Sequence, residues 1–127
     1  MQLQGIRVVD LSRIVAGPFC SMFLADMGAE VIKIEDVDEG DPVRRQGILR
    51  NGFSLYFASF NRNKRSLTLD LRSAEGKAVL RRLIATADVV LDNFRPGVME
   101  KIGLSRDELL RIKPDLVSCH ITGIGPE

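Results

Sequence analysis

Residues 5–35, GIRVVDLSRIVAGPFCSMFLADMGAEVIKIE, are the stretch that most constrains the fold. Its first apolar run, Ile6–Leu11, is rich in β-branched residues, as a buried strand requires. A glycine and a proline then suit a turn leading into a helix over Pro18–Met27, and Gly28 suits the position that ends such a helix. Glu30–Glu35 predicts a second strand. Two strands joined through a helix form a parallel βαβ unit with a right-handed crossover.

The rest of the chain continues this alternation of strands and helices. We expect further strands at Ser66–Leu71, Asp88–Asp92 and Leu116–Thr122, and helices at Ser73–Thr86, Val98–Ile102 and Ser105–Ile112. The apolar run Ser54–Phe60 suits a short helix or an edge strand, and we favour the helix. The pattern predicts one α/β unit: a Rossmann-like, doubly wound parallel sheet of about five strands, with the expected order 3-2-1-4-5.

This strand order makes strands 1 and 4 neighbours, at the point where the winding of the sheet reverses. Ligands of such sheets bind there, outside the carboxyl ends of the strands. The turns that leave those two strands are Ser12–Gly17 and Asn93–Gly97, so we expect the ligand site at these turns. The polar, glycine-containing segment Asp36–Gly52 is predicted to be a long loop, and such loops are usually functional or mobile.

Composition excludes several classes of function. The formal net charge of +1 gives no reason to expect a nucleic acid or an anionic membrane as partner. Cys20 and Cys119 form no CxxC pair, and we interpret them as reduced core thiols of a cytosolic protein. His120 is the only histidine, so no metal site is expected. The apolar segment Ile14–Ala25 superficially resembles a signal peptide, but a proline interrupts it and a strand follows, so we expect a cytoplasmic location.

Other motifs leave alternatives open. No Walker A sequence and no GxGxxG fingerprint follows the first strand, which disfavours NAD as a ligand. Phe94 either fills the core or stacks on a planar group such as adenine. Helix Pro18–Met27 is apolar nearly all round, so we expect a further segment or a partner to cover it. Five basic residues near strand and helix ends are either a solvated surface or phosphate contacts: Lys64, Arg65, Arg72, Arg95 and Lys101.

Several blocks of the sequence resemble a known family, in the same order along nearly the whole chain. These blocks are LSRIVAGPFCSMFLADMGAEVIKIE, GDPVR, NRNKRSLTLDL, ADVVLDNFRPGVMEKIGL and ITGIGP. They resemble the amino-terminal part of class III CoA-transferases, the L-carnitine dehydratase/bile-acid-inducible family, which includes formyl-CoA transferases and α-methylacyl-CoA racemases. The resemblance implies that residues 1–127 are the amino-terminal part of a large, Rossmann-like CoA-binding domain. It also implies that a small domain and a carboxyl-terminal segment are absent, and that the parent protein is an interlocked homodimer.

The resemblance also implies which residues contact coenzyme A. They are Ile14, Val15 and Ala16 against the nucleotide, Leu69 and Arg72 at the adenine and phosphate, Asn93 and Phe94 at the CoA moiety, and Lys101 at a phosphate. Asp36 stands where some transferases carry an arginine, so one phosphate contact of the family is not expected here. The catalytic aspartate of the transferases matches no residue of this chain, and it is expected beyond Glu127. The acid–base pair of the racemases is expected beyond Glu127 as well.

The function expected from the resemblance is the CoA-binding part of a CoA-transferase. Such an enzyme moves CoA between an acyl-CoA and a carboxylic acid through an aspartyl intermediate, so this chain alone is predicted to be inactive. The alternatives are a fragment of an α-methylacyl-CoA racemase and a non-catalytic CoA-binding or scaffold module. The long segment Asp36–Gly52, followed by SLYFASFNRNKR, favours the transferase over the racemase.

Overall fold

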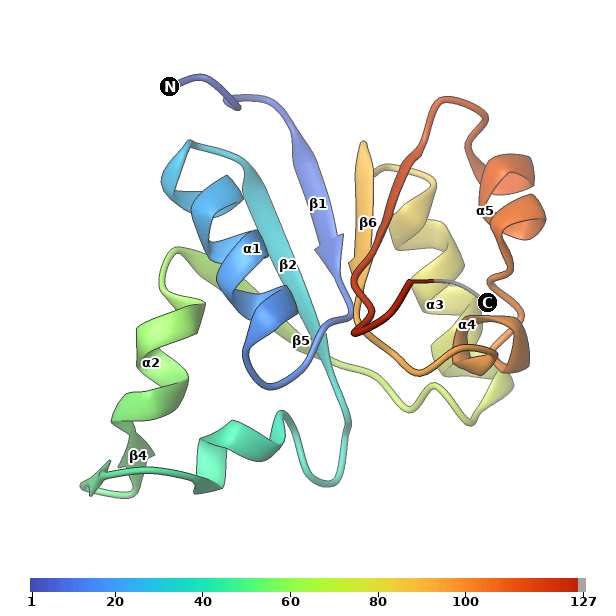
Figure 1. The fold of residues 1–127 in the computed structure, drawn as a ribbon. Coiled ribbons are helices and arrows are strands. Elements are labelled where there is room, and N and C mark those ends of the chain that lie inside the picture. Colours follow the sequence, from blue (N-terminus) through green and yellow to red (C-terminus); the bar gives the residue numbers. More distant parts are fainter. Residues whose placement is uncertain (126–127) are drawn as a thin grey trace.

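Five parallel strands form the central sheet of the computed structural model, which describes residues 1–125. Their order is β5-β2-β1-β6-β7, so the first strand is central and the predicted order 3-2-1-4-5 is confirmed (Figure 1). The strands are β1 Arg7–Asp10, β2 Glu30–Glu35, β5 Lys64–Thr68, β6 Val89–Asp92 and β7 Val117–His120. β1 pairs in parallel with both β2 and β6, which places the reversal of winding between β1 and β6.

Helices connect the strands and cover both faces of the sheet. They are α1 Ala16–Asp26, α2 Leu55–Asn61, α3 Ala74–Ile84, α4 Val98–Lys101 and α5 Arg106–Ile112. Figure 1 shows α1, with α2 beside it, on one side of the sheet and α3, α4 and α5 on the other. The side chains of successive strand residues are therefore buried on opposite faces of the sheet, as expected for a sheet covered on both faces. Val8 packs with Ala25 on the α1 side, whereas Val9 packs with Leu80 and Leu109 on the α3 and α5 side.

The segment between β2 and β5 differs from the prediction in several places. Asp36–Gly52 was expected to be loop throughout, but it contains a 3₁₀ helix at Pro42–Arg45 and the first strand of a hairpin, β3 Leu49–Arg50. The second strand of the hairpin is β4 Phe53–Ser54. The favoured helix at residues 54–60 is confirmed as α2. Ser54 Oγ caps its amino end by accepting from Phe57 N at 3.0 Å.

The third strand of the sheet begins two residues earlier than predicted, at Lys64 rather than Ser66. The apolar alternation of the leucines suggested Ser66–Leu71, but Leu69 and Leu71 follow the strand and pack against the core beyond it. In the ladder with β2, the first pair of residues is Val31↔Lys64, which sets the start of β5. Of the two alternatives left open for Lys64, the solvated surface is wrong, because its side chain is only 2% exposed and pairs with Asp10.

Helix α1 leaves part of its apolar surface open. Phe19, Phe23 and Met27 are each about half exposed, at 45%, 52% and 45%. Phe19 and Phe23 pack edge to face at 4.8 Å, and Phe60 of α2 lies 6.1 Å from Phe19. The expected cover of this helix stays a prediction. Within residues 1–125, no helix is both long enough and apolar enough to cross a membrane.

Candidate functional site

The turn after β1 holds the most constrained backbone of the site. Ile14 adopts φ +70°, a left-handed conformation that is unfavourable for a β-branched residue. Asn93, from the turn after β6, holds both backbone groups of Arg13, the residue before Ile14. Its Oδ1 accepts from Arg13 N at 2.8 Å and its Nδ2 donates to Arg13 O at 2.9 Å. Gly17 is required because a Cβ there would lie 2.1 Å from the Cβ of Ser12. The two turns predicted to form the site are therefore hydrogen-bonded to each other.

A buried ion pair lies beneath this turn. Asp10 ends β1 and is fully buried, and its carboxylate accepts from Ser12 N at 2.9 Å and from the hydroxyls of Ser12 and Ser21. Lys64 Nζ lies 3.3 Å from Asp10 Oδ2 and also donates to Pro18 O at 2.9 Å. Burial is the main cause that lowers the pKa of Lys64 to about 8; the attraction of Asp10 opposes this shift, and the positive charge of Lys33 adds to it.

The long segment after β2 is anchored at Glu35. Arg44 forms a bidentate contact with this carboxylate, at 2.6 Å from Nε and 2.7 Å from Nη2. Ser66 Oγ and Asp41 N donate to the same group at 2.8 and 3.0 Å. Burial by itself would raise the pKa of Glu35, but these hydrogen bonds outweigh it and lower the pKa to about 2. The Arg44 guanidinium also lies 3.8 Å from the ring centre of Phe57, which fixes the segment against α2.

A cavity of about 550 Å³ opens at the carboxyl ends of β1, β2 and β6. It lies at the predicted reversal point of the sheet. Five of the eight residues predicted to contact CoA line it: Ile14, Leu69, Arg72, Asn93 and Phe94. The other three do not line it: Val15 and Ala16 lie at the start of α1, and Lys101 is exposed at the end of α4. Their predicted contacts, like those of the other five, remain predictions.

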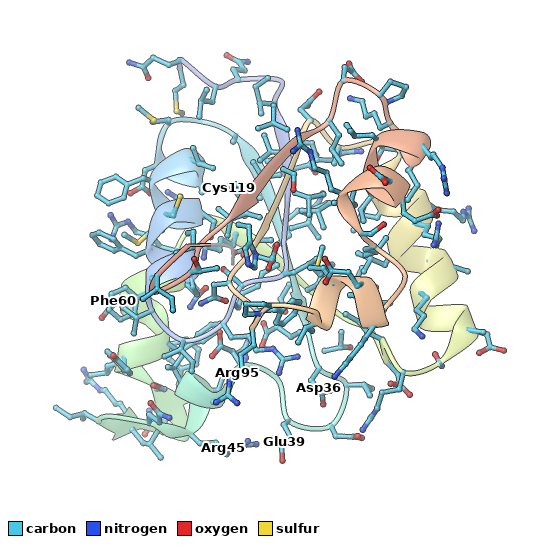
Figure 2. The ribbon with its side chains drawn as sticks, turned by 45° about the vertical axis from the view of Figure 1, so that its right-hand side comes forward. Asp36, Glu39, Arg45, Phe60, Arg95 and Cys119 are labelled. Carbon is cyan, nitrogen blue, oxygen red and sulfur yellow. The ribbon has the colours of Figure 1, made fainter. Side chains whose placement is uncertain are left out.

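The remaining walls of the cavity combine apolar side chains, arginines and the acidic residues Glu35 and Asp36. Leu11, Ile34, Leu71, Val98 and Ile102 contribute apolar surface, and Arg13 and Arg95 contribute positive charge. Arg13 lies 5.3 Å from the ring centre of Phe94. Arg72 pairs with Asp38 and Asp70, each at 2.8 Å, and these carboxylates raise the pKa of Arg72. Figure 2 shows Asp36, after β2, and Arg95, after β6, at the same end of the molecule.

Sequence reasoning missed a second pair of side chains, on the other side of β6. Asp92 ends β6 and His120 ends β7, and the two are register partners in the sheet. His120 Nδ1 lies 2.6 Å from Asp92 Oδ1, at a cavity of about 830 Å³ that Arg95 also lines. Burial raises the pKa of Asp92, and the hydrogen bond with His120 opposes this shift. The parallel order of strands 4 and 5 was the available signal, because it places the last residues of both strands side by side.

No metal centre accompanies this cavity among the residues described. Within residues 1–125, no three His, Cys, Asp or Glu side chains are grouped so that they could hold a metal ion. Cys20 and Cys119 are free thiols and are half-buried. Burial is also the main reason that the pKa of Cys20 is raised, so this thiol is not activated as a nucleophile.

The structure is that of an α/β protein with a cavity at the reversal point of a doubly wound sheet, where ligands of such sheets bind. The model of CoA-transferase family III matches residues 3–127. The chain therefore belongs to CoA-transferase family III.

Individual relatives agree with this assignment. The chain is 46% identical over 124 residues to a succinyl-CoA–D-citramalate CoA-transferase of Chloroflexus aurantiacus, covering 97% of this chain and 31% of the relative. It is 43% identical over 125 residues to a formyl-CoA:oxalate CoA-transferase of Afipia carboxidovorans, covering 98% and 30%. The crystal structure of a CAIB/BAIF family protein from Brucella suis superposes with a TM-score of 0.89 at 46% identity, covering 97% and 34%. The chain thus spans about a third of the length of these relatives.

Proposed function

We propose that this chain is the amino-terminal, CoA-binding part of a class III CoA-transferase. The parent enzyme would move CoA between an acyl-CoA and a carboxylic acid. The observation that carries this proposal is the cavity at the reversal point, which gathers Ile14, Leu69, Arg72, Asn93 and Phe94 from three separate stretches of the chain. The named relatives support the reaction, since they are a succinyl-CoA–D-citramalate and a formyl-CoA:oxalate CoA-transferase.

The chemistry of the cavity suits coenzyme A. Its leucines and Phe94 offer flat apolar surface to an adenine, and Arg13, Arg72 and Arg95 offer positive charge to phosphates. Coenzyme A carries a diphosphate, a ribose phosphate and an adenine, so the cavity has a group for each. A dinucleotide would require the close backbone approach that the GxGxxG sequence allows, and the turn after β1 is instead SRIVAG.

The rest of the enzyme's chemistry is assigned to segments beyond this chain. The proposed nucleophile is an aspartate after Glu127. In the proposed parent protein, a small domain and a carboxyl-terminal segment complete the fold. We also propose that this parent protein is an interlocked homodimer in the cytoplasm. No CoA transfer by residues 1–127 alone is therefore expected. The non-enzymatic alternative remains a stand-alone CoA-binding or scaffold module without catalysis.

A second candidate function is acid–base chemistry on an acyl-CoA by residues of this chain, distinct from the racemases' own acid–base pair, which is expected beyond Glu127. The Asp92–His120 pair favours it, since a carboxylate bound to Nδ1 leaves Nε2 as the basic nitrogen of the imidazole. The transferase remains the first candidate because both named relatives are CoA-transferases.

Calorimetric titration of the chain with CoA tests the proposal. We expect CoA to bind more tightly than NAD, and Arg72→Ala to weaken the binding. The loss on Arg72→Ala should be modest, because the Arg72 guanidinium is exposed to solvent and Asp38 and Asp70 compete for it. Lys101→Ala should have a smaller effect, because Lys101 does not line the cavity. Arg82→Ala, an exposed change on α3, is the matched control. Equal binding of NAD and CoA would overturn the assignment of the cavity.

A further inference from the structure

A second buried ion pair acts directly on the turn that carries Ile14. Lys33 in β2 and Asp41 in the long segment are 2.8 Å apart from Nζ to Oδ2, and their side chains are 1% and 0% exposed. Lys33 Nζ also donates to Ser12 O at 2.7 Å. Asp41 accepts from Ile14 N, with both carboxylate oxygens at 3.2 Å. The pair therefore holds the backbone on each side of Arg13.

The hydrogen bonds to the backbone of Ser12, Arg13 and Ile14 come from side chains distant in sequence or from Asp10. Ser12 is held through Asp10 and Lys33, Arg13 through Asn93, and Ile14 through Asp41. A β-branched residue prefers negative φ, and the cost of the left-handed region corresponds to roughly a five- to thirtyfold population difference. Ile14 nevertheless adopts φ +70° and remains 47% exposed at the cavity wall. Strain of this kind persists only where the surroundings impose it.

We propose that Asp41 and Lys33 are positioning residues for the CoA cavity, and that their ion pair holds Ile14 in the left-handed conformation which forms the cavity wall. Neither side chain lines the cavity, so both act through the turn. The proposal gives a role to the Gly40–Arg44 segment, GDPVR. Asp41 sets the turn after β1, and Arg44 fastens the same segment to Glu35. This inference rests on the proposed function for its ligand, but not for its conformational part.

The first measurement needs no ligand. The ¹³Cα and ¹³Cβ chemical shifts of Ile14 report its φ and ψ, and the amide shift reports the bond to Asp41. We expect left-handed values in the unaltered chain and in Glu39→Gln, which removes an exposed carboxylate from the same segment. In the double variant Lys33→Met with Asp41→Ala, which removes the acceptor of Ile14 N and leaves no unpaired buried charge, the Ile14 shifts should move to the values of negative φ. Unchanged Ile14 shifts in a folded double variant would overturn the proposal.

The second measurement is CoA affinity by calorimetry. If only the left-handed state binds, the apparent affinity falls with its population, so the double variant should bind CoA about tenfold more weakly. The control Glu39→Gln should bind as the unaltered chain does. Failure of the unaltered chain to bind CoA would overturn the proposed function, while the Ile14 shifts would still decide the conformational claim.

A glycine at position 14 separates positioning from general damage to the fold. Glycine adopts positive φ without the penalty that isoleucine has. We therefore expect the Lys33→Met, Asp41→Ala change to weaken CoA binding by less than about threefold in an Ile14→Gly background, against about tenfold in the Ile14 background. Equal losses in both backgrounds would show that the ion pair merely supports the fold, and would overturn the positioning role. If the double variant does not fold, Asp41→Ala alone is compared in the two backgrounds in the same way.

Discussion

Replacing Glu35 with glutamine should remove a defined share of the pH dependence of stability. The pKa of Glu35 falls from 4.5 to about 2 on folding, and its side chain is 2% exposed. Because the folded-state pKa is the lower one, the stabilisation is fully present above pH 4.5 and is lost as the pH falls toward 2. This pKa difference between the folded and unfolded states corresponds to a contribution of about 3 kcal/mol to the free energy of unfolding at neutral pH. The partly exposed Arg44 reduces the figure through solvent screening to about 2–3 kcal/mol.

Urea unfolding at a series of pH values measures this effect. Glu35→Gln should be less stable than the unaltered chain by about 2–3 kcal/mol at neutral pH, and the gap should close as the pH approaches 2. Other carboxylates titrate in the same range, so the informative quantity is the difference between the two proteins at each pH. Glu39→Gln is the control, because its ion pair with Arg45 is exposed and should contribute little at any pH. Parallel curves for Glu35→Gln and the unaltered chain would refute the reasoning.

Two further predictions concern the other buried groups. Lys64 has a folded-state pKa of about 8 against 10.5 unfolded, so unfolding takes up a proton between these values and stability should rise with pH by up to about 3 kcal/mol. Urea unfolding of Lys64→Met should lack that rise, and an identical rise would contradict the assignment. If the Asp92–His120 pair moves protons, incubation of the chain with an acyl-CoA in D₂O should exchange the α-hydrogens. His120→Gln should abolish the exchange measured by mass spectrometry, whereas no exchange by the unaltered chain removes the second candidate function.

The order of the sheet could be predicted because the relevant signals are local. The strand Ile6–Leu11 and the helix after it are contiguous in sequence, and the alternation of elements then fixes which strand ends meet. Ile14, Asn93 and Phe94 gather at the cavity because the turns 12–17 and 93–97 leave neighbouring strands. Leu69 and Arg72 join them because they follow β5, whose carboxyl end lies at the same edge of the sheet. The hairpin β3–β4 was not predicted, because its strands are two residues long and too short to show an alternation.

The buried ion pairs could not be predicted from composition or periodicity. Lys64 occurs within a run of polar and basic residues, NRNKR, which is typical of a surface turn. Only the pairing of β5 with β2 places it at Asp10, 54 positions away in the sequence. Asp41 lies in a segment that seemed to be loop, and its contact with Ile14 spans 27 positions. Such contacts depend on tertiary structure, and no local pattern encodes them.

Stability alone does not explain why these charges are buried. A buried ion pair often contributes no more than apolar side chains of the same volume, because the cost of removing two charges from water offsets their attraction. Apolar residues at Lys33 and Asp41 would fill the same space, but they would leave Ser12 O without its donor and Ile14 N without its acceptor. The turn would then follow the preference of isoleucine for negative φ. The Lys33–Asp41 pair therefore stabilises the shape of the cavity wall rather than the sheet beneath it.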